Sequence, residues 1–314
     1  MCLSEKGRKM NNLELIRLLA NEIKDIEIQV GFKLFLDHKK QNNRIDTYNY
    51  YKKHIKVLLV FFSNEKISFF QNITNFHIGQ LKDYLKNKDV KNVTINKFLQ
   101  VLKCTINFLV DNDLITKPNL KIDKLKESKP ELNIIDMNTA IKIIKYIFNE
   151  ELKIQFRVAI LLILTTGIRR TELIHIKTVN IHIEDSKIYL DRTKTGNSRY
   201  IYLVNEIKPL IQELLNERKD STYLFLDKDG NQASQYMVDR YFRKLKKDLD
   251  IKNLSPHMLR HFYATILINN NTDINTVRLL MGHETISMTL RYIDTLNEKL
   301  KQANQENNPI NILK

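Results

Sequence analysis

Residues 181–204 read IHIEDSKIYLDRTKTGNSRYIYLV, and this stretch decides the fold class. Apolar and polar residues alternate along it, and many of its side chains are β-branched or aromatic, which is the pattern of half-buried strands. The segments EDS at 184–186 and TGN at 195–197 supply the turns. We therefore predict a small three-stranded antiparallel sheet. Elsewhere apolar residues recur at helical spacing, so the predicted fold is mainly α with this one small sheet.

Helical periodicity divides the rest of the chain into two groups of helices. Residues 117–130 (KPNLKIDKLKESKP) separate the groups, because they are polar, carry a proline near each end and have no strong period. Before this linker we predict a four- or five-helix bundle with a lysine-rich face. After it, Asp136 is a suitable N-cap, Ser255 and Pro256 begin a helix, and Gly282 is suited to end one. The predicted helices cover residues 11–36, 47–67, 78–86, 93–112, 137–148, 151–166, 206–218, 234–249, 257–269 and 273–281.

The chain has 314 residues and a formal net charge of +15, to which both parts contribute. Residues 1–128 carry 23 basic and 14 acidic side chains, and residues 129–314 carry 28 and 22. Such a surplus favours a polyanionic partner, because Lys and Arg near phosphates release condensed counterions. A lysine-coated surface that keeps the protein in solution explains the charge alone equally well.

Cysteine usage and apolar runs indicate a cytoplasmic protein. Cys2 and Cys104 form no framework spacing, and the sequence has no CxxC motif, Cys/His cluster or carboxylate-rich metal cluster. The first residues lack the apolar core of a secretory signal. The longest aliphatic run, residues 158–164, is too short for a membrane span of ~20 residues. We predict a soluble, intracellular chain with no metal and no membrane partner.

Two stretches of the second group of helices place a basic residue at a helix end or in a turn. In TGIRRTEL, residues 166–173, an arginine follows a glycine where a buried helix ends, and Arg169 can pair with Glu172 one helical turn later. In TKTGN, residues 193–197, a lysine sits in a turn between two strands. Each stretch alone is explained by a solvated side chain at a helix end or in a hairpin.

Two further stretches follow in the same group of helices. SPHMLRH, residues 255–261, places His257 and Arg260 on one face of a first helical turn, beside a helix N-terminus that favours an anion. MGHE, residues 281–284, is followed nine residues after its histidine by Tyr292. A histidine after a helix end and a tyrosine on a terminal helix are more often structural when each is taken alone.

Read together and in this order, the four stretches resemble the tyrosine recombinase (phage integrase) family over about residues 130–300. TGIRRTEL is similar to the first arginine box of that family, TKTGNSRYIYL to its β-hairpin lysine segment and HMLRHFYAT to its His-x-x-Arg box. MGHETISMTLRYI is similar to its Gly-His and nucleophile segment. The resemblance implies an N-terminal extension at 1–24, a core-binding, SAM-like helical domain at 25–116, a linker at 117–130, a catalytic domain at 131–300 and a tail at 301–314.

The resemblance also implies a chemistry of covalent strand exchange. Tyr292 would attack the scissile phosphate and form a 3′-phosphotyrosyl ester, which stores the energy of the bond so that rejoining needs no ATP. Lys194, on the hairpin, would protonate the departing 5′-oxygen. The other implied site residues are Arg169 and Arg260 on the phosphate oxygens, His257 as acid–base partner, His283 as a donor to the phosphate and Glu172 as support for Arg169 or His257.

One register question remains at the first arginine box, because Arg169 and Arg170 are adjacent. Arg169 directly follows the Thr-Gly-Ile segment and lies three residues before Glu172, so it is the preferred assignment. A shift by one residue would give the role to Arg170.

Duplex DNA is the expected partner of both halves of the chain, held in a C-shaped clamp mostly through its phosphates. The family's chemistry implies a tetramer on two DNA sites and no cofactor. The tail either docks its apolar residues Ile310, Ile312 and Leu313 into a neighbouring subunit or is a frayed polar end. Accessory DNA-bending or directionality proteins are compatible with this interpretation. The expected phosphate-contacting residues are Lys52, Lys53, Lys56, Lys97 and Lys103 in the bundle and Arg240, Arg243 and Lys244 in the 234–249 helix.

The biological role has more than one interpretation. Residues 1–24 are too few for an added arm-type DNA-binding domain, which suits a simple integrase of a phage or mobile element, the favoured role, or a Xer-type recombinase that resolves replicon dimers. Two alternatives belong to other functional classes. One is a catalytically inactive DNA-binding regulator, and the other is a helical scaffold with no nucleic-acid role. The presence of Tyr292, Arg169 and Arg260 argues against the regulator, and a steep salt dependence of DNA binding would exclude the scaffold.

Overall fold

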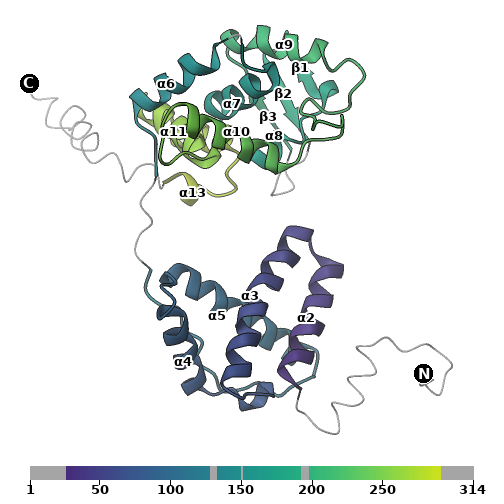
Figure 1. Cartoon of the computed structure of the whole chain (residues 1–314), viewed down its shortest axis with the longest axis vertical. Coiled ribbons are helices and arrows are strands. Elements are labelled where there is room, and N and C mark those ends of the chain that lie inside the picture. The colour runs from purple at the N-terminus through teal and green to yellow at the C-terminus, as the bar shows by residue number, and fades with distance from the viewer. Residues whose placement is uncertain (1–25, 128–132, 150, 192–197, 291–314) are drawn as a thin grey trace, which may run out of the picture. The chain divides into compact units, whose positions relative to one another are not determined.

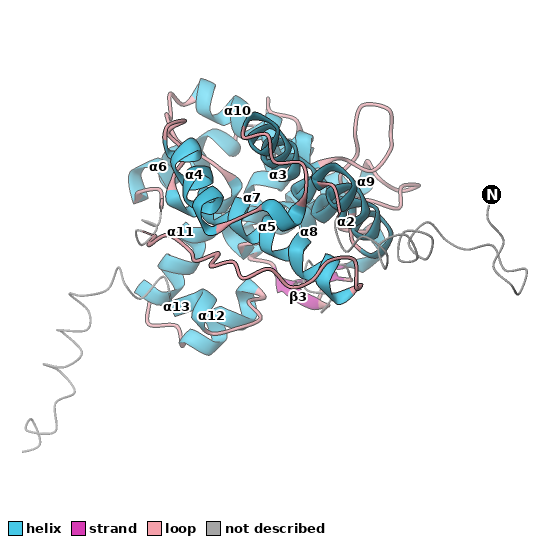
Figure 2. Cartoon of the chain, turned by 90° about the horizontal axis from the view of Figure 1, so that it is seen from below, coloured by secondary structure: helices cyan, strands magenta, loops and turns pink. Residues whose placement is uncertain are grey.

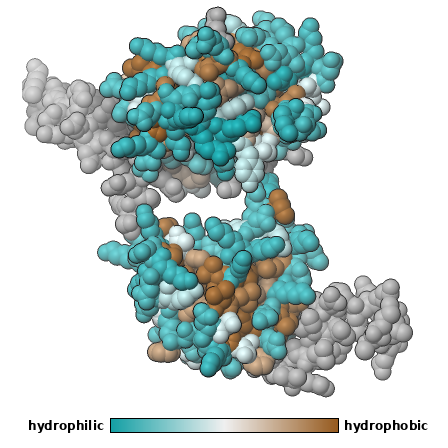
Figure 3. Space-filling view, in the orientation of Figure 1, coloured by the Kyte–Doolittle hydropathy of each residue, from teal (hydrophilic) through white to brown (hydrophobic). Residues whose placement is uncertain are grey.

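A computed structural model describes residues 26–127, 133–149, 151–191 and 198–290, which belong to two compact units divided in the sequence between residues 129 and 130 (Figure 1). Each unit has its own hydrophobic core. Hydrophilic side chains cover most of the visible face of the second unit, whereas a broader hydrophobic area is visible on the first (Figure 3). None of the helices in the described ranges has the length and apolar character needed to cross a membrane.

The described part of the first unit is a bundle of helices around an aromatic core. Phe32, Phe35 and Phe70 are almost fully buried, and the rings of Phe32 and Phe70 meet edge to face with centroids 5.3 Å apart. Such rings bury large apolar areas, which is the main source of stability in a bundle of this size. Its elements are α2 (Ile28–Asn42), α3 (Ile45–Asn64), η1 (Phe70–Asn72), α4 (Asn75–Lys86) and α5 (Asn92–Asp111).

The helix predicted over residues 11–36 is confirmed for residues 28–36 and is wrong at residues 26–27. Residues 26–27 are not helical, because Glu27 forms an isolated antiparallel bridge with Phe69 and the N–H of Phe70 donates to the Ile26 carbonyl at 3.0 Å. Helix α2 therefore begins at Ile28, and it continues to Asn42 through Lys, His and Gln residues that carry no apolar pattern but tolerate helix well. Residues 11–25 lie outside the described residues.

Part of the stretch that separates the two groups of helices lies against the first unit. Asn96, a buried polar residue of α5, accepts from the Leu125 N–H at 2.8 Å and donates to the Leu125 carbonyl at 2.9 Å. Asn75 at the start of α4 accepts from the Lys121 N–H at 2.7 Å. These two asparagines hold residues 119–127 along α4 and α5.

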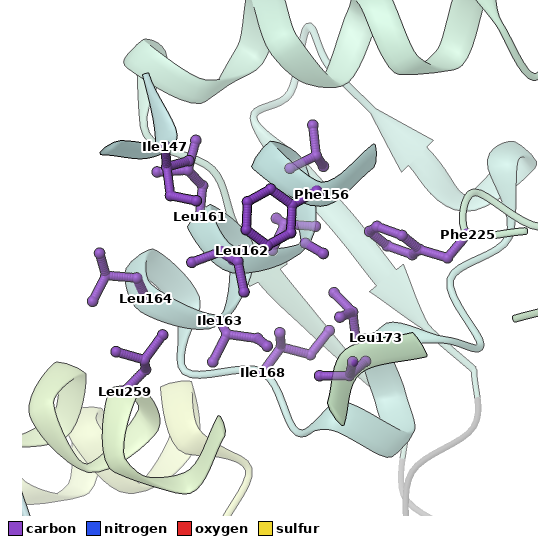
Figure 4. Close-up of a cluster of buried hydrophobic side chains, with 14 of the residues drawn as sticks. Ile147, Phe156, Leu161, Leu162, Ile163, Leu164, Ile168, Leu173, Phe225 and Leu259 are labelled. Atoms are coloured by element: carbon purple, nitrogen blue, oxygen red, sulfur yellow. The ribbon is translucent and has the colours of Figure 1, made fainter. Parts of the chain in front are cut away.

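Helix α7 (Ile154–Thr166) is the centre of the second unit and is buried along nearly its whole length. Figure 4 shows its side chains Leu161, Leu162, Ile163 and Leu164 among residues from other segments. A helix that is apolar all round must be covered on every side. The surrounding helices are α6 (Met137–Ile147), α8 (Arg170–Leu173), α9 (Lys208–Asn216), α10 (Gln235–Asp248) and α11 (Pro256–Asn269), followed by α12 (Ile274–Met281) and α13 (Ser287–Leu290).

The sheet predicted from residues 181–204 is present. Strands β1 (Ile181–His182), β2 (Lys187–Leu190) and β3 (Arg199–Tyr202) pair in the order β1-β2-β3, and both pairs are antiparallel. Figure 2, coloured by secondary structure, shows β3 in magenta among elements that are otherwise helices and loops. The 3-10 turns η2 (Thr178–Asn180) and η3 (Asn205–Ile207) flank the sheet. The predicted class, mainly α with one small antiparallel sheet, is confirmed.

Three predicted helix ends are confirmed by their geometry. The Asp136 carboxylate accepts from the Thr139 N–H at 2.6 Å, and the Ser255 hydroxyl accepts from the Met258 N–H at 3.3 Å. Gly282 ends α12 in the left-handed conformation, with φ of +62°. These ends fix where α6, α11 and α12 start or stop.

Candidate active site

Two glycines in the left-handed conformation shape the candidate active site. Gly167 ends α7 with φ of +60°, and Gly282 ends α12 with φ of +62°. A left-handed residue turns the chain sharply and leaves carbonyl groups at the helix end without helical partners. The carbonyls of Gly167, Met281 and Gly282 accept hydrogen bonds from arginine side chains.

Arg260 joins these two helix ends. It lies on α11, is buried, and donates from Nη1 to the Gly167 carbonyl and from Nη2 to the Met281 carbonyl, the latter at 2.6 Å. The N-cap at Ser255 starts α11 so that Arg260 faces inward. A buried guanidinium with fixed partners points in one direction before any ligand arrives.

Arg169 and Glu172 form the centre of the site. Nη1 of Arg169 donates to Oε1 of Glu172 at 2.7 Å, and the Arg169 backbone N–H donates to Oε2 at 3.1 Å. Nη2 of Arg169 donates to the Gly282 carbonyl at 2.7 Å. The neighbouring Arg170 pairs instead with Asp239 of α10, where both side chains are more than a third exposed. The geometry therefore places Arg169, and not Arg170, beside Glu172.

One residue of this centre, Arg199, is not among the site residues predicted from the sequence. Its Nη1 donates to the same Oε1 of Glu172 at 2.9 Å. The strand alternation could have found it, because Arg199 opens β3 two residues before the buried Ile201 and therefore faces the same side of the sheet.

The Glu172 carboxylate is ionised in this surrounding. It is only 2% exposed, and burial raises the pKa of its carboxyl. The hydrogen bonds and charges of Arg199 and Arg169 outweigh burial, so the pKa of Glu172 lies below its ordinary value.

His283 is buried beside the arginines and is neutral. Burial, together with the charges of the neighbouring arginines and of His261, lowers its pKa to about 3. Its Nδ1 lies 2.8 Å from the hydroxyl oxygen of the buried Thr289. The cluster thus has three guanidinium groups against one carboxylate and a neutral imidazole, a net charge of +2. Such a cluster attracts an anion.

Comparison with known proteins identifies the family. The model described as "Phage integrase family" matches residues 133–299, and the "Phage integrase SAM-like domain" matches residues 30–129. The chain belongs to the phage integrase family. Among curated tyrosine recombinases, XerD of Oceanobacillus iheyensis is 23% identical over 275 residues, covering 84% of this chain and 92% of that protein. XerC of Listeria welshimeri is 25% identical over 284 residues, covering 87% and 94%.

Solved structures share the fold of this phage integrase family member. A Tn1549 transposon integrase in complex with a circular intermediate DNA has a TM-score of 0.71 at 20% identity, covering 88% of this chain and 99% of that one. The XerH site-specific recombinase bound to a palindromic difH substrate has a TM-score of 0.72 at 19% identity, covering 96% and 90%. The predicted function, a site-specific tyrosine recombinase with a tyrosine nucleophile, is confirmed at the level of the family.

The structure brings together four of the predicted site residues of this phage integrase family member, Arg169, Glu172, Arg260 and His283. His257 is exposed on the first turn of α11, where its ring stacks on His261 with centroids 6.4 Å apart. The predicted general acid Lys194 and nucleophile Tyr292 lie outside the described residues, as does the apolar tail Ile310, Ile312 and Leu313.

The predicted DNA-contacting residues are all exposed, and they fall on three helices. Lys52, Lys53 and Lys56 of α3 line one groove together with Leu36 and Leu59. Lys97 and Lys103 lie on α5, and Arg240, Arg243 and Lys244 lie on α10. Lys244 is paired with Asp248 at 2.7 Å, so its charge is partly neutralised within the protein.

Proposed function

We propose that the chain cuts and rejoins duplex DNA with Tyr292 as nucleophile and a 3′-phosphotyrosyl ester as intermediate. The observation that carries the proposal is the cluster of three guanidinium groups around one carboxylate. Its net positive charge suits the negative charge that develops on the oxygens of a pentacoordinate phosphorus transition state. The DNA complexes of the Tn1549 integrase and XerH support the same partner for this chain.

Arg169 and Arg260 are proposed to bind the non-bridging oxygens of the scissile phosphate. Guanidinium groups stay charged at every physiological pH and hold two oxygens by paired N–H groups. Glu172 would orient Arg169 without reacting. His283, a neutral ring whose Nδ1 lies 2.8 Å from the Thr289 hydroxyl, is proposed to donate to the phosphate in the tautomer that carries its proton on Nε2.

The proposed step forms one bond and breaks one. Oη of Tyr292 attacks phosphorus while the bond to the 5′-oxygen breaks, and Lys194 donates a proton to that oxygen. The tyrosine proton passes to His257. In the reverse step the 5′-hydroxyl of a partner strand attacks the phosphotyrosyl ester and Lys194 takes up the proton of that hydroxyl. The bond to Tyr292 breaks, and His257 returns its proton to the tyrosine oxygen. No ATP is consumed because the bond energy is conserved.

A suicide substrate tests this proposal. A selection from a random duplex library supplies a bound site, and a nick beside the cleavage position lets the short fragment diffuse away so that the covalent adduct accumulates. We expect an adduct on a denaturing gel for the wild type and for Tyr236→Phe, whose ring is exposed on α10, and none for Tyr292→Phe. An adduct that survives Tyr292→Phe contradicts the assignment of the nucleophile, and the absence of a wild-type adduct contradicts the function.

The lysines of α3 and α5 are proposed to contact DNA phosphates. The plot of log affinity against log salt has a negative slope, and each lost phosphate contact reduces the magnitude of that slope by about 1 without changing sequence preference. We expect this for Lys52→Gln and Lys56→Gln, measured by fluorescence anisotropy between low and moderate salt. Lys86→Gln on α4, whose ammonium pairs with Asp83, is the matched control. Equal slopes for all three variants and the wild type would remove α3 from the interface.

For the biological role we propose an integrase that inserts and excises a phage or mobile element, acting as a tetramer on two DNA sites in the cytoplasm. The likeness to a transposon integrase supports this role, and the relatives named XerC and XerD support dimer resolution as the alternative. Expression of the chain beside its own flanking sequences, followed by junction sequencing, separates them. A circular element points to the integrase, and resolution of a replicon dimer points to the Xer-type role.

A further inference from the structure

Arg199 is the first residue of β3, and its side chain lies inside the site. It opens β3 opposite the buried Leu190 of β2, and its side chain is 12% exposed. Its Nη1 donates to Glu172 at 2.9 Å, which fixes the plane of the guanidinium. Strand pairing and this ion pair together leave the side chain little freedom.

The remaining edge of this guanidinium is unused. Nε and Nη2 of Arg199 are buried and have no hydrogen-bond partner among the residues that the structure describes. Buried donors without partners are rare in folded proteins and call for an explanation such as a ligand. These two N–H groups lie side by side on one edge and form the fork that binds two oxygens of a phosphate or carboxylate.

Gly282 covers one face of the Arg199 guanidinium, so a ligand would approach along the edge that carries Nε and Nη2. A Cβ placed on Gly282 would lie 2.8 Å from each of three Arg199 atoms, Cζ, Nε and Nη1, so the guanidinium packs directly on that glycine. The Gly282 carbonyl is the group that anchors Arg169 at 2.7 Å. Arg199 and Arg169 therefore meet at the same turn and at the same carboxylate.

We propose that Arg199 is a third phosphate-binding residue of this site, with Nε and Nη2 directed at non-bridging oxygens of the scissile phosphate. This inference rests on the proposed function. Without Arg199 the cluster would hold two guanidinium groups and one carboxylate, a net charge of +1. Arg199 raises this charge to +2 and so strengthens the attraction for the negative charge that develops on the non-bridging oxygens in the transition state.

The test compares each protein on two substrates under single-turnover, saturating conditions. One suicide substrate has a normal scissile phosphate, and in the other a methyl group replaces one non-bridging oxygen and removes the charge. We expect Arg199→Met to slow cleavage of the normal substrate about 100-fold or more, in line with the loss of a preorganised donor. On the methylphosphonate the deficit should shrink at least tenfold. Because each protein is compared with itself, a reduced folded fraction cancels.

Two further variants keep the test decisive. Arg170→Met, which removes the adjacent arginine that pairs with Asp239, should cleave both substrates within about twofold of the wild type. Arg199→Lys keeps the charge beside Glu172 but lacks the fork, and should lie between Arg199→Met and the wild type. If the wild type forms an adduct and the Arg199 deficit is the same on both substrates, or below threefold, the residue does not bind the phosphate and the proposal is overturned. A wild type without adduct overturns the proposed function instead.

Discussion

Replacing the Glu172 carboxylate by an amide should destabilise the second unit strongly. Glu172 is 2% exposed, and its Oε1 accepts from two guanidinium groups, at 2.7 Å from Arg169 and 2.9 Å from Arg199. Glu172→Gln keeps the shape but removes the negative charge that the two arginines share. Breaking a buried ion pair by neutralising one partner costs about 3–5 kcal/mol, because the other charge stays buried and uncompensated.

The chain contains a matched control for this change. Asp239 accepts from Arg170 at 2.6 Å, a similar distance, but the two side chains are 42% and 36% exposed. Solvent screens such a pair, so Asp239→Asn should cost about 0–1 kcal/mol. The same carboxylate-to-amide change beside an arginine is thus made once in the interior and once at the surface.

Calorimetry of the full chain measures both variants at pH 7. For a unit of this size, 3–5 kcal/mol corresponds to a fall in the melting temperature of about 6–20 °C. The folded pKa of Glu172 lies below its unfolded value, so its contribution is present above about pH 4.5 and is lost as the pH falls through the folded pKa. The gap between Glu172→Gln and the wild type should therefore narrow in acid. Melting temperatures for Glu172→Gln and Asp239→Asn that agree within about 2 °C at pH 7 would refute the reasoning.

Three other changes have expected outcomes. Gly282→Ala adds a Cβ at a φ of +62° and 2.8 Å from the Arg199 guanidinium, so it should both lower the melting temperature and slow cleavage; wild-type cleavage would contradict the close packing. The folded pKa of His283 is about 3 against an ordinary 6.5, so its ring should show no protonation above about pH 4 by NMR. Titration of His283 leaves the free energy of unfolding unchanged above pH 6.5 and lowers it by at most about 1.4 kcal/mol per pH unit below that pH. His283→Gln should reduce this dependence of stability on pH. Asn96→Ala should cost the first unit about 2 kcal/mol in chemical denaturation, because the Leu125 backbone loses both of its partners; a loss below 0.5 kcal/mol would contradict that role.

The parts of the structure that local rules govern could be predicted from the sequence. The alternation over residues 181–204 gave the sheet, and the caps at Asp136 and Ser255 gave helix starts, because each depends on a few neighbouring residues. The helix predicted over residues 11–36 is wrong at residues 26–27 for the opposite reason. Its pattern continues through Ile26 and Glu27, but pairing with Phe69, more than 40 positions away, extends the backbone there.

The residues of the candidate site also differ in whether the sequence alone could identify them. Arg169, Arg260 and His283 were identified because the order of motifs marks them, and Glu172 because it lies one helical turn from Arg169. Arg199 was not identified, because strand alternation indicates only that it faces inward. What it meets there, Glu172 and Gly282, lies 27 and 83 residues away and depends on how β3 packs beside α8 and α12.

The way the arginines are anchored bears on how the site works. Arg260 and Arg169 take their fixed hydrogen bonds largely from carbonyls at the ends of α7 and α12, which carry the negative ends of the helix dipoles. Carboxylates in place of these carbonyls would hold the arginine side chains equally firmly but would cancel the charge of the guanidinium groups. Neutral carbonyls fix the direction of a guanidinium and leave its charge for a phosphate. Glu172 is the exception, and it is shared between two arginines, so it neutralises only one of them. We therefore expect the cluster to be arranged before DNA arrives, so that its charge acts on the transition state without first having to be assembled.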